Sequence, residues 1–215
     1  MSTTPSQRDL QKARTRRALL DAGLGLLKEQ SLSSLGLREI TRAVGISPAA
    51  FYRHFRDVSD LGVALVEESL GSLHEVIRSG LTEHTEDAER IDHLVGAIAA
   101  YVRAHPEHIR FVASERHGGV AAVRTAIAAE LDRFAAEVAR LLAEDEVSRG
   151  WSAEDLRMLG ETYVDNMVMT ASAFLEAAQG EGPASETVAH TARRQLRLIS
   201  LGRRHWTTSG QISDA

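Results

Sequence analysis

The sequence predicts an all-α protein, and three observations lead to that fold class. The 215 residues include only 5% aromatic residues and four prolines, whereas Ala, Leu, Glu and Arg, which favour helices, are abundant. Apolar residues recur at spacings of three and four along most of the chain, as on one face of an amphipathic helix. The alternation of polar and apolar residues that marks strand hairpins is not sustained anywhere. Together these patterns indicate about nine helices.

The first three expected helices have clear start and stop signals. Apolar residues at helical spacing mark the first from about Leu10 to Glu29, with basic residues between them. The second covers Leu37–Val44 and stops at Gly45, a residue suited to the left-handed position after a helix. Ser47-Pro48 then provides an N-cap with proline at the first helical position, so a third helix is expected from there to Phe55.

The other expected helices make up the rest of the chain. Asp57 and Ser152 can each cap a helix, and His105-Pro106 must interrupt one because proline lacks an amide proton. The expected ranges are about 57–81, 91–102, 106–116, 120–143, 152–178 and 185–206. Residues 1–6 and 207–215 are expected to be frayed ends.

The net charge of −5 conceals two regions of opposite sign. Residues 1–57 hold ten basic and five acidic residues, a net charge of +5. The remaining 158 residues hold fifteen basic and twenty-five acidic residues, a net charge of −10. A basic N-terminal module on a larger acidic body is typical of a nucleic-acid-binding protein with a separate second domain.

Residues 37–55 have the layout of a helix-turn-helix, in which two short helices are joined by a turn that contains glycine. A small core that sets the angle between the helices is expected from Leu37, Ile40, Val44, Ile46, Phe51 and Phe55. The residues left exposed are Ser47, Pro48, Ala49, Ala50, Tyr52, Arg53 and His54. Small side chains let the helix approach base edges, and Arg53 is a natural donor to guanine or phosphate. Tyr52 and His54 suit phosphate oxygens, which position a protein without reading sequence.

The run Leu-Arg-Glu-Ile-Thr-Arg-Ala-Val-Gly-Ile-Ser-Pro-Ala-Ala-Phe-Tyr-Arg-His-Phe at 37–55 resembles the DNA-binding signature of the TetR family of bacterial repressors. The likeness covers roughly residues 14–61. It implies a homodimer that binds double-stranded operator DNA through its N-terminal helices and senses a small-molecule effector through the others. The expected domains are 1–57 for DNA binding, 58–206 for sensing and dimerisation, and a flexible tail at 207–215.

The resemblance also assigns site residues. It places base-reading positions on Arg38, on Ser47 to Ala50 and on Arg53, and phosphate contacts on Thr15, Tyr52 and His54. Two positions depart from the family pattern. A lysine that many members carry for a phosphate is Val58 here, so that contact is lost or moved to Arg56. The cap of the second helix, often Thr, is Gly36, which has no side-chain oxygen.

A narrower resemblance extends over the run from Phe51 to Glu68, in which Val58 and Gly62 are themselves unusual for the wider family. With Glu115-Arg-His-Gly-Gly119 and the run 194–202, it is similar to the branch that represses unsaturated fatty-acid synthesis or desaturase genes. That branch senses acyl-CoA or a related acyl thioester, which makes such a molecule the expected effector, and it implies no cofactor.

An acyl chain needs a long apolar cavity, which several helices can line together. The apolar candidates are Ile77, Ile98, Val102, Phe111, Phe134, Val138, Met167 and Phe174, although the same residues can simply pack as core. Tyr163 and Asn166 are polar residues on an apolar helix, where they either bond within the core or face a ligand. Arg116 and His117, beside Gly118-Gly119, are the candidates for the anionic end of the ligand.

The last two expected helices, 152–178 and 185–206, carry apolar stripes with small residues. Such helices suit a symmetric four-helix interface between two subunits, so a homodimer through the two C-terminal helices is expected.

Several other functions lack support in the sequence. His105-Pro-Glu-His108 has a usable ligand spacing, but no further ligand follows at a coordinated spacing and the chain has no Cys, so no metal is expected. The motifs of nucleotide-binding and hydrolytic enzymes are not present either, so we expect no catalytic residues. Without a signal peptide or a run of about 18 apolar residues, a soluble cytoplasmic protein with no membrane contact is expected.

Two alternative functions remain open at this stage. The first is a TetR-type repressor of efflux or catabolic genes that senses an aromatic or drug-like molecule. The second, from a different class, is a helical enzyme that modifies a small molecule.

Overall fold

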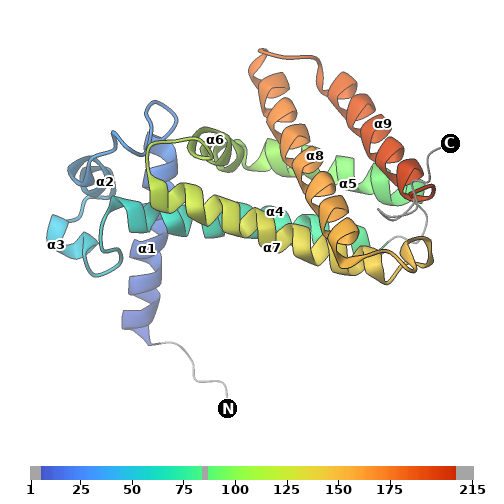
Figure 1. The fold of residues 1–215 in the computed structure, drawn as a ribbon. Helices are drawn as coiled ribbons and strands as arrows, with labels where there is room; N and C mark the ends of the chain where they lie inside the picture. The colour runs from blue at the N-terminus through green and yellow to red at the C-terminus, as the bar shows by residue number, and fades with distance from the viewer. Residues whose placement is uncertain (1–5, 84–86, 207–215) are drawn as a thin grey trace.

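The computed structural model describes residues 6–83 and 87–206, and the fold over these residues is helical without strands (Figure 1). The all-α prediction is therefore confirmed. The α-helices are α1 (Gln7–Leu26), α2 (Leu37–Val44), α3 (Pro48–Phe51), α4 (Val58–Glu83), α5 (Asp87–Ala104), α6 (Pro106–Glu115), α7 (Ala121–Ala143), α8 (Ala153–Gln179) and α9 (Ser185–Arg203). One 3₁₀ turn, η1 (Glu146–Ser148), which the sequence did not predict, precedes α8. Of the ends expected to be frayed, residues 1–5 and 207–215 lie outside the described residues, whereas Ser6 is the ordered N-cap of α1.

Figure 1 shows three parts along the length of the molecule. Helices α1, α2 and α3 lie at one end, and α8 and α9 stand side by side at the other. The long helices α4 and α7 run between the two ends and pack against each other. The chain thus places its basic N-terminal region and its C-terminal helix pair far apart, joined by two continuous helices.

Capping explains where the N-terminal helices begin. α1 starts at Gln7 rather than at Leu10, because Ser6 and Asp9 form a capping box. The Asp9 amide donates to the Ser6 hydroxyl at 3.3 Å, and the Ser6 amide donates to the Asp9 carboxylate at 3.3 Å. The turn after α2 is as expected, since Gly45 takes the left-handed conformation with φ of 74°.

The predicted extent of the third helix was wrong. α3 ends at Phe51 instead of Phe55, and residues 52–54 form a turn. The Arg53 amide donates to the Ala50 carbonyl at 3.3 Å and the His54 amide to the Phe51 carbonyl at 2.8 Å. These bonds span three residues and not four, which tightens the chain into a 3₁₀-like turn. Both Phe51 and Phe55 are buried as a result.

Two hydrophobic cores occupy the described residues. One lies mainly within α4, α5, α7, α8 and α9 and includes Ile77, Ile98 and Met167. The other holds the N-terminal helices together, yet it also includes Phe111 of α6 and Ile127 of α7. The N-terminal region is therefore packed directly onto the body through a shared core.

Helices α7 and α8 cross at very close range. A Cβ atom at Gly160 of α8 would lie 2.4 Å from the carbonyl oxygen of Ala135 and 3.1 Å from the amide nitrogen of Ala139. Only glycine fits there, because a side chain would collide with backbone that cannot move aside. This crossing fixes α8 against α7 and so sets the width of the space beside them.

At the C-terminal end, α9 stops at Arg203 and not at residue 206 as expected. Arg203 is buried and forms an ion pair with Asp145, just before η1. α8 ends at Gly180, with φ of 76°, as the sequence predicted. Among the described residues, no helix is long and apolar enough to cross a membrane.

Candidate DNA-binding surface and effector cavities

The start of α3 presents the predicted recognition residues to solvent at the outer end of the molecule (Figure 1). Tyr52 is 60% exposed, whereas its neighbour Phe51 is 0% exposed and anchors the helix in the core. Ala50 and His54 are half-buried. The remaining predicted residues, all exposed, are Arg38, Ser47, Pro48, Ala49 and Arg53. One side of α3 is therefore packed against the core, and the other side is exposed to solvent.

Local hydrogen bonds fix the two helices of this motif. The Ser47 hydroxyl accepts a hydrogen bond from the Ala50 amide at 3.2 Å, which caps α3 and leaves the hydroxyl proton free to donate. At the start of α2, the missing cap at Gly36 is offset by Glu39, whose carboxylate accepts from the Gly36 amide at 3.4 Å. Both helix starts are thus stabilised by local hydrogen bonds, and that of α3 is stabilised by Ser47, which is itself a predicted base-reading position.

His54 lies among cations and is held in its neutral form. Burial of the ring lowers the pKa of His54, and the charges of Lys12, Arg16 and Arg53 lower it further. Its Nδ1 atom is buried and has no hydrogen-bond partner in the described part of the chain. A neutral ring surrounded by three cations is an environment that an anion such as a phosphate would relieve.

The other residues predicted to contact phosphates, Thr15 and Arg56, are already bonded within the protein. Thr15 is half-buried, and its hydroxyl donates to the Gln11 carbonyl at 3.1 Å. Val58 offers no charge, and the candidate replacement, Arg56, forms an ion pair with Asp60 at 2.8 Å. The Arg56 side chain is 87% exposed, so this pair must open before the guanidinium can reach a phosphate.

The apolar candidates for a ligand site are all buried, in two different cores. Phe111 belongs to the core of the N-terminal helices, whereas the other seven belong to the core of the body. Four of them border small cavities: Ile77 and Phe134 line one of about 20 Å³, Val138 lines one of about 40 Å³, and Met167 lines both. Sequence reasoning could not separate cavity-lining from core residues, because both are apolar and point inward.

The polar candidates lie at different places. Tyr163 borders the cavity of about 40 Å³ together with Met167. Asn166 donates to the Gln195 side chain at 3.2 Å, so it connects α8 to α9. Arg116 and His117 line two larger cavities, of about 370 and 180 Å³, one on each side of the junction between α6 and α7.

The cavities follow one another through the body. The cavity of about 180 Å³ shares Arg116 and His117 with the largest one, and it shares Leu70, Leu73 and Val168 with the cavity of about 20 Å³. Met167 in turn lies between the two smallest. Sequence reasoning did not single out Leu70 and Val168 as cavity residues, although their apolar spacing on α4 and α8 is visible in the sequence.

The largest cavity has mixed charge. Arg116 and Arg124 line it, and so do Asp132, Glu161 and Asp165. The Arg116 guanidinium lies 3.4 Å from the Asp165 carboxylate, while Arg124 donates to the Gly118 carbonyl at 2.6 Å. An anionic group entering here would compete with Asp165 for Arg116.

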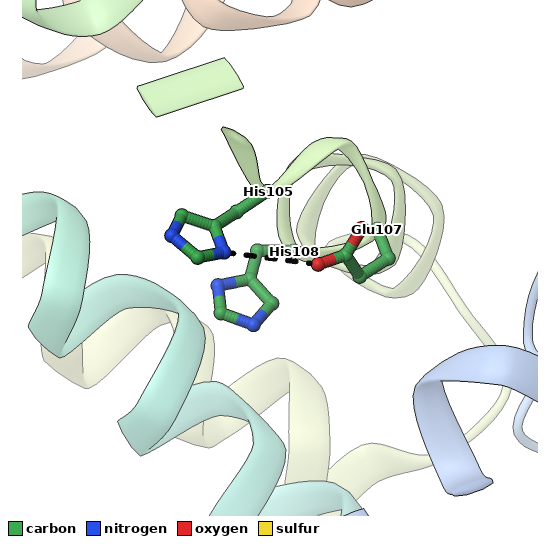
Figure 2. Close-up of side chains that lie close together, drawn as sticks. All are labelled: His105, Glu107 and His108. Atoms are coloured by element: carbon green, nitrogen blue, oxygen red, sulfur yellow. Dashed lines mark ion pairs between the residues drawn. The ribbon is translucent and has the colours of Figure 1, made fainter. Parts of the chain in front are cut away.

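A histidine pair with a nearby carboxylate lies at the start of α6 (Figure 2). Glu107, which the sequence analysis did not consider, provides a third group beside His105 and His108, and one ligand atom of each lies within 4.8 Å of the others. The two rings are stacked with planes only 13° apart, so their in-plane nitrogen lone pairs lie in separate, nearly parallel planes and do not converge on one ion. The positive end of α6 further disfavours a cation.

His108 is instead part of a buried polar contact. The Tyr101 hydroxyl donates to the Ser69 carbonyl at 2.9 Å, so its oxygen is left to accept from His108 Nδ1 at 2.7 Å. Burial raises the pKa of Tyr101 to about 12 and lowers that of His108. Both groups are therefore neutral near pH 7 and hold α4, α5 and α6 together.

Comparison with known proteins supports the geometry of the N-terminal region. Residues 19–65 match the sequence pattern of the family described as "Bacterial regulatory proteins, tetR family". The matched residues contain α2, α3 and the turn between them, together with the end of α1 and the start of α4.

Solved structures share the whole fold at low sequence identity. The fatty acid degradation regulator FadR from Bacillus halodurans is 17% identical, with a TM-score of 0.68 over 91% of this chain and 96% of that one. A TetR-family transcriptional regulator from Streptomyces coelicolor is 18% identical, with a TM-score of 0.63 over 89% and 97%. A Clostridium perfringens protein named as a candidate fatty acid metabolism regulator is 13% identical, with a TM-score of 0.65 over 83% of this chain and 96% of that one. Residues 19–65 thus match the N-terminal domain of the tetR family of bacterial regulatory proteins, and the chain as a whole shares its fold with these solved proteins.

Proposed function

We propose that this chain is a transcriptional regulator that binds a palindromic operator as a homodimer and responds to acyl-CoA or a related acyl thioester. In this proposal it represses genes of fatty-acid synthesis or desaturation. The observation that carries the DNA-binding part is the exposure of Ser47, Pro48 and Ala49 at the start of α3, and of Tyr52 and Arg53 in the turn that follows the buried Phe51. In a dimer, two such helices enter successive major grooves about 34–36 Å apart.

DNA binding is tested by selecting duplexes from a randomised pool with the purified protein. The expected outcome is enrichment of an inverted repeat, and loss of that enrichment when Arg53→Ala replaces the wild type. Recovery of the same repeat by both proteins would place base reading elsewhere, and no enrichment with the wild type would contradict DNA recognition. The selected repeat then serves as the operator in the experiments below.

The dimer is supported by an apolar surface at the far end of the molecule. Met169 of α8 and Leu198 of α9 are each 71% exposed, which is unusual for large apolar side chains on adjacent helices. Sedimentation is expected to give a dimer for the wild type and a monomer for the double variant Met169→Glu, Leu198→Glu. Leu10→Glu, which places the same charge on an exposed apolar residue of α1, is the control and should stay dimeric.

The effector part is supported by the succession of cavities that leads from Arg116 and His117 into the core. A cationic junction next to an apolar path suits an anionic head with a hydrocarbon tail. Two solved proteins with this fold are named as fatty acid regulators, although at 17% and 13% identity they indicate only that the fold can serve such a role. Native mass spectrometry of the protein purified from cells should detect bound acyl-CoA or fatty acid.

A repressor of efflux or catabolic genes that senses a compact aromatic or drug-like molecule is the second candidate. The size of the cavities favours it, because the apolar ones hold about 180 Å³ or less, whereas ligand sites commonly hold about 300–1,000 Å³. An acyl chain therefore requires the core to open. A co-purified aromatic compound, with no effect of oleoyl-CoA on operator binding, would select this alternative.

A further inference from the structure

The α1–α2 loop of the DNA-binding region is held by a buried carboxylate of the body. Glu115, the last residue of α6, is 1% exposed, and its Oε1 atom accepts a hydrogen bond from the Leu32 amide at 2.9 Å. Its Oε2 atom is buried without a hydrogen-bond partner. A carboxylate is costly to bury, so a single backbone amide is weak compensation unless the position has another role.

The glycines after Glu115 make room for this contact. A Cβ atom at Gly118 would lie 2.2 Å from the Glu115 Oε2 atom, so any other residue there would displace the carboxylate. A Cβ atom at Gly119 would lie 3.1 Å from the side chain of Ser33 in the same loop. The run Glu115-Arg-His-Gly-Gly119 is thereby explained as a close fit between the end of α6 and the α1–α2 loop.

The side chain of Leu32 is seated in the body as well. It is 2% exposed, and its Cδ2 atom would lie only 2.5 Å from a Cβ atom at Gly62 of α4. Val123 of α7 borders the same spot at 2.8 Å. The loop that leads into α2 thus contacts α4, α6 and α7 at one residue, through its backbone and its side chain.

The same end of α6 borders the cavities. Arg116 and His117 directly follow Glu115 and line both the cavity of about 370 Å³ and that of about 180 Å³. In the described part of the chain, the half-buried Arg116 forms an ion pair with the exposed Asp165 at 3.4 Å, and such a partly exposed pair is weak enough for a bound anion to replace. Because Arg116 directly follows Glu115, a change in the backbone at Arg116 also moves Glu115.

We propose that Glu115 is the positioning residue through which occupation of the cavities beside Arg116 and His117 is transmitted to the DNA-binding helices. This inference rests on the proposed function, which supplies the effector that binds beside Arg116 and His117. Movement of the α6 end shifts the hydrogen bond to Leu32, and with it the α1–α2 loop, so the spacing of the two recognition helices in a dimer changes.

The test compares two carboxylates of the body that both reach the DNA-binding region. Glu115 bonds a buried backbone amide, whereas Glu68 of α4 meets the exposed Arg17 side chain at 2.8 Å. Glu115→Ala removes the proposed contact, Glu115→Gln keeps an oxygen that can accept from Leu32, and Glu68→Ala is the matched control. Hydrogen exchange of the amides in residues 31–35 and operator affinity are measured on the full-length protein with and without oleoyl-CoA.

In the wild type, oleoyl-CoA is expected to change operator affinity by at least about 5-fold and to alter exchange in the loop. In Glu115→Ala, loop exchange is expected to be faster and the same with or without oleoyl-CoA, and the affinity ratio should fall to within about 2-fold while oleoyl-CoA still binds. Glu115→Gln and Glu68→Ala should keep most of the wild-type ratio. If Glu115→Ala keeps the full ratio, the proposal is overturned.

If oleoyl-CoA is not the effector, the experiment gives a result that differs from a failure of the Glu115 contact. Should oleoyl-CoA not bind the wild type, the acyl-CoA part of the function fails, and the exchange of residues 31–35 without ligand still decides the contact. Exchange that is no faster in Glu115→Ala than in the wild type would then overturn the role of Glu115. Leu94→Ala, in the core of the body away from the loop, controls for general loss of stability, since Leu94 is 3% exposed.

Discussion

The N-terminal end and the body of the molecule present their candidate site residues in opposite ways. At the N-terminal end, Tyr52 and Arg53 are exposed in the turn that directly follows Phe51, which is buried in the core. In the body, the candidate ligand residues are themselves core, and the apolar cavities between them are small. Under the proposed function, the DNA-reading surface is therefore formed in advance, whereas the effector site must open as its ligand enters. Such an opening is what allows ligand binding to change the shape of the body.

The largest effect is expected where the preformed surface depends on one buried side chain. Phe51→Ala should lower the free energy of unfolding by about 3–5 kcal/mol, because it leaves a cavity at a residue that is 0% exposed. Tyr52→Ala, one position on and 60% exposed, should change it by about 0.5 kcal/mol or less. Urea unfolding of both variants makes the comparison, and equal losses would mean that α3 is not anchored by Phe51.

The exposed residues should affect DNA binding and not folding. Arg53→Ala is expected to weaken binding to the selected operator by about 1–3 kcal/mol, while the dimer and its unfolding midpoint stay unchanged. Tyr52→Phe should weaken operator binding less than Arg53→Ala, because it removes only one hydroxyl contact to a phosphate. Fluorescence anisotropy with a labelled duplex measures both. Unchanged affinity in both variants would show that the recognition surface has been misassigned.

A substitution that fills a cavity in the body should weaken effector binding and leave DNA binding unchanged. Val168 borders both the cavity of about 180 Å³ and that of about 20 Å³. Val168→Phe should reduce oleoyl-CoA affinity at least about tenfold, or about 1.4 kcal/mol, and leave operator binding without ligand intact. Val147→Phe on η1, which borders none of these cavities, is the control for calorimetry. Equal affinities for wild type and Val168→Phe would exclude this path for the acyl chain.

The smallest expected effect is a pH dependence of DNA binding. The pKa of His54 is lowered in the free protein by burial and by Lys12, Arg16 and Arg53. A phosphate beside the ring raises this pKa, so binding takes up a proton, and affinity should increase as the pH falls from above the bound-state pKa towards the free-state pKa. The slope is at most about tenfold per pH unit. His54→Asn should remove it, and a slope that persists in this variant would assign the proton to another group.

Local signals in the sequence were sufficient for the N-terminal end. Gly45 and Ser47-Pro48 define a turn and a helix start within a few residues, so the structure follows them closely. The tight turn after Phe51 was missed, because both a helix and a 3₁₀ turn keep Phe51 and Phe55 on one side. Domain boundaries and individual site residues remain predictions.

Long-range packing explains why less of the body could be predicted. The contact between Glu115 and Leu32 joins residues 83 positions apart, and no periodic pattern announces it. Which apolar residues border a cavity depends on how helices cross, as α7 and α8 do at Gly160. The glycines of the run Glu115–Gly119 were visible in the sequence, but their role in making room for Glu115 and Ser33 becomes clear only from the folded chain.

The central claim is that a DNA-binding surface formed in advance is controlled by a site that opens in the body. The most direct measurement is the anisotropy titration of the selected operator with wild-type protein, in the absence and presence of saturating oleoyl-CoA. The account predicts a change in Kd of at least about 5-fold, in either direction. An unchanged Kd, while calorimetry on the same sample records bound oleoyl-CoA, would contradict it.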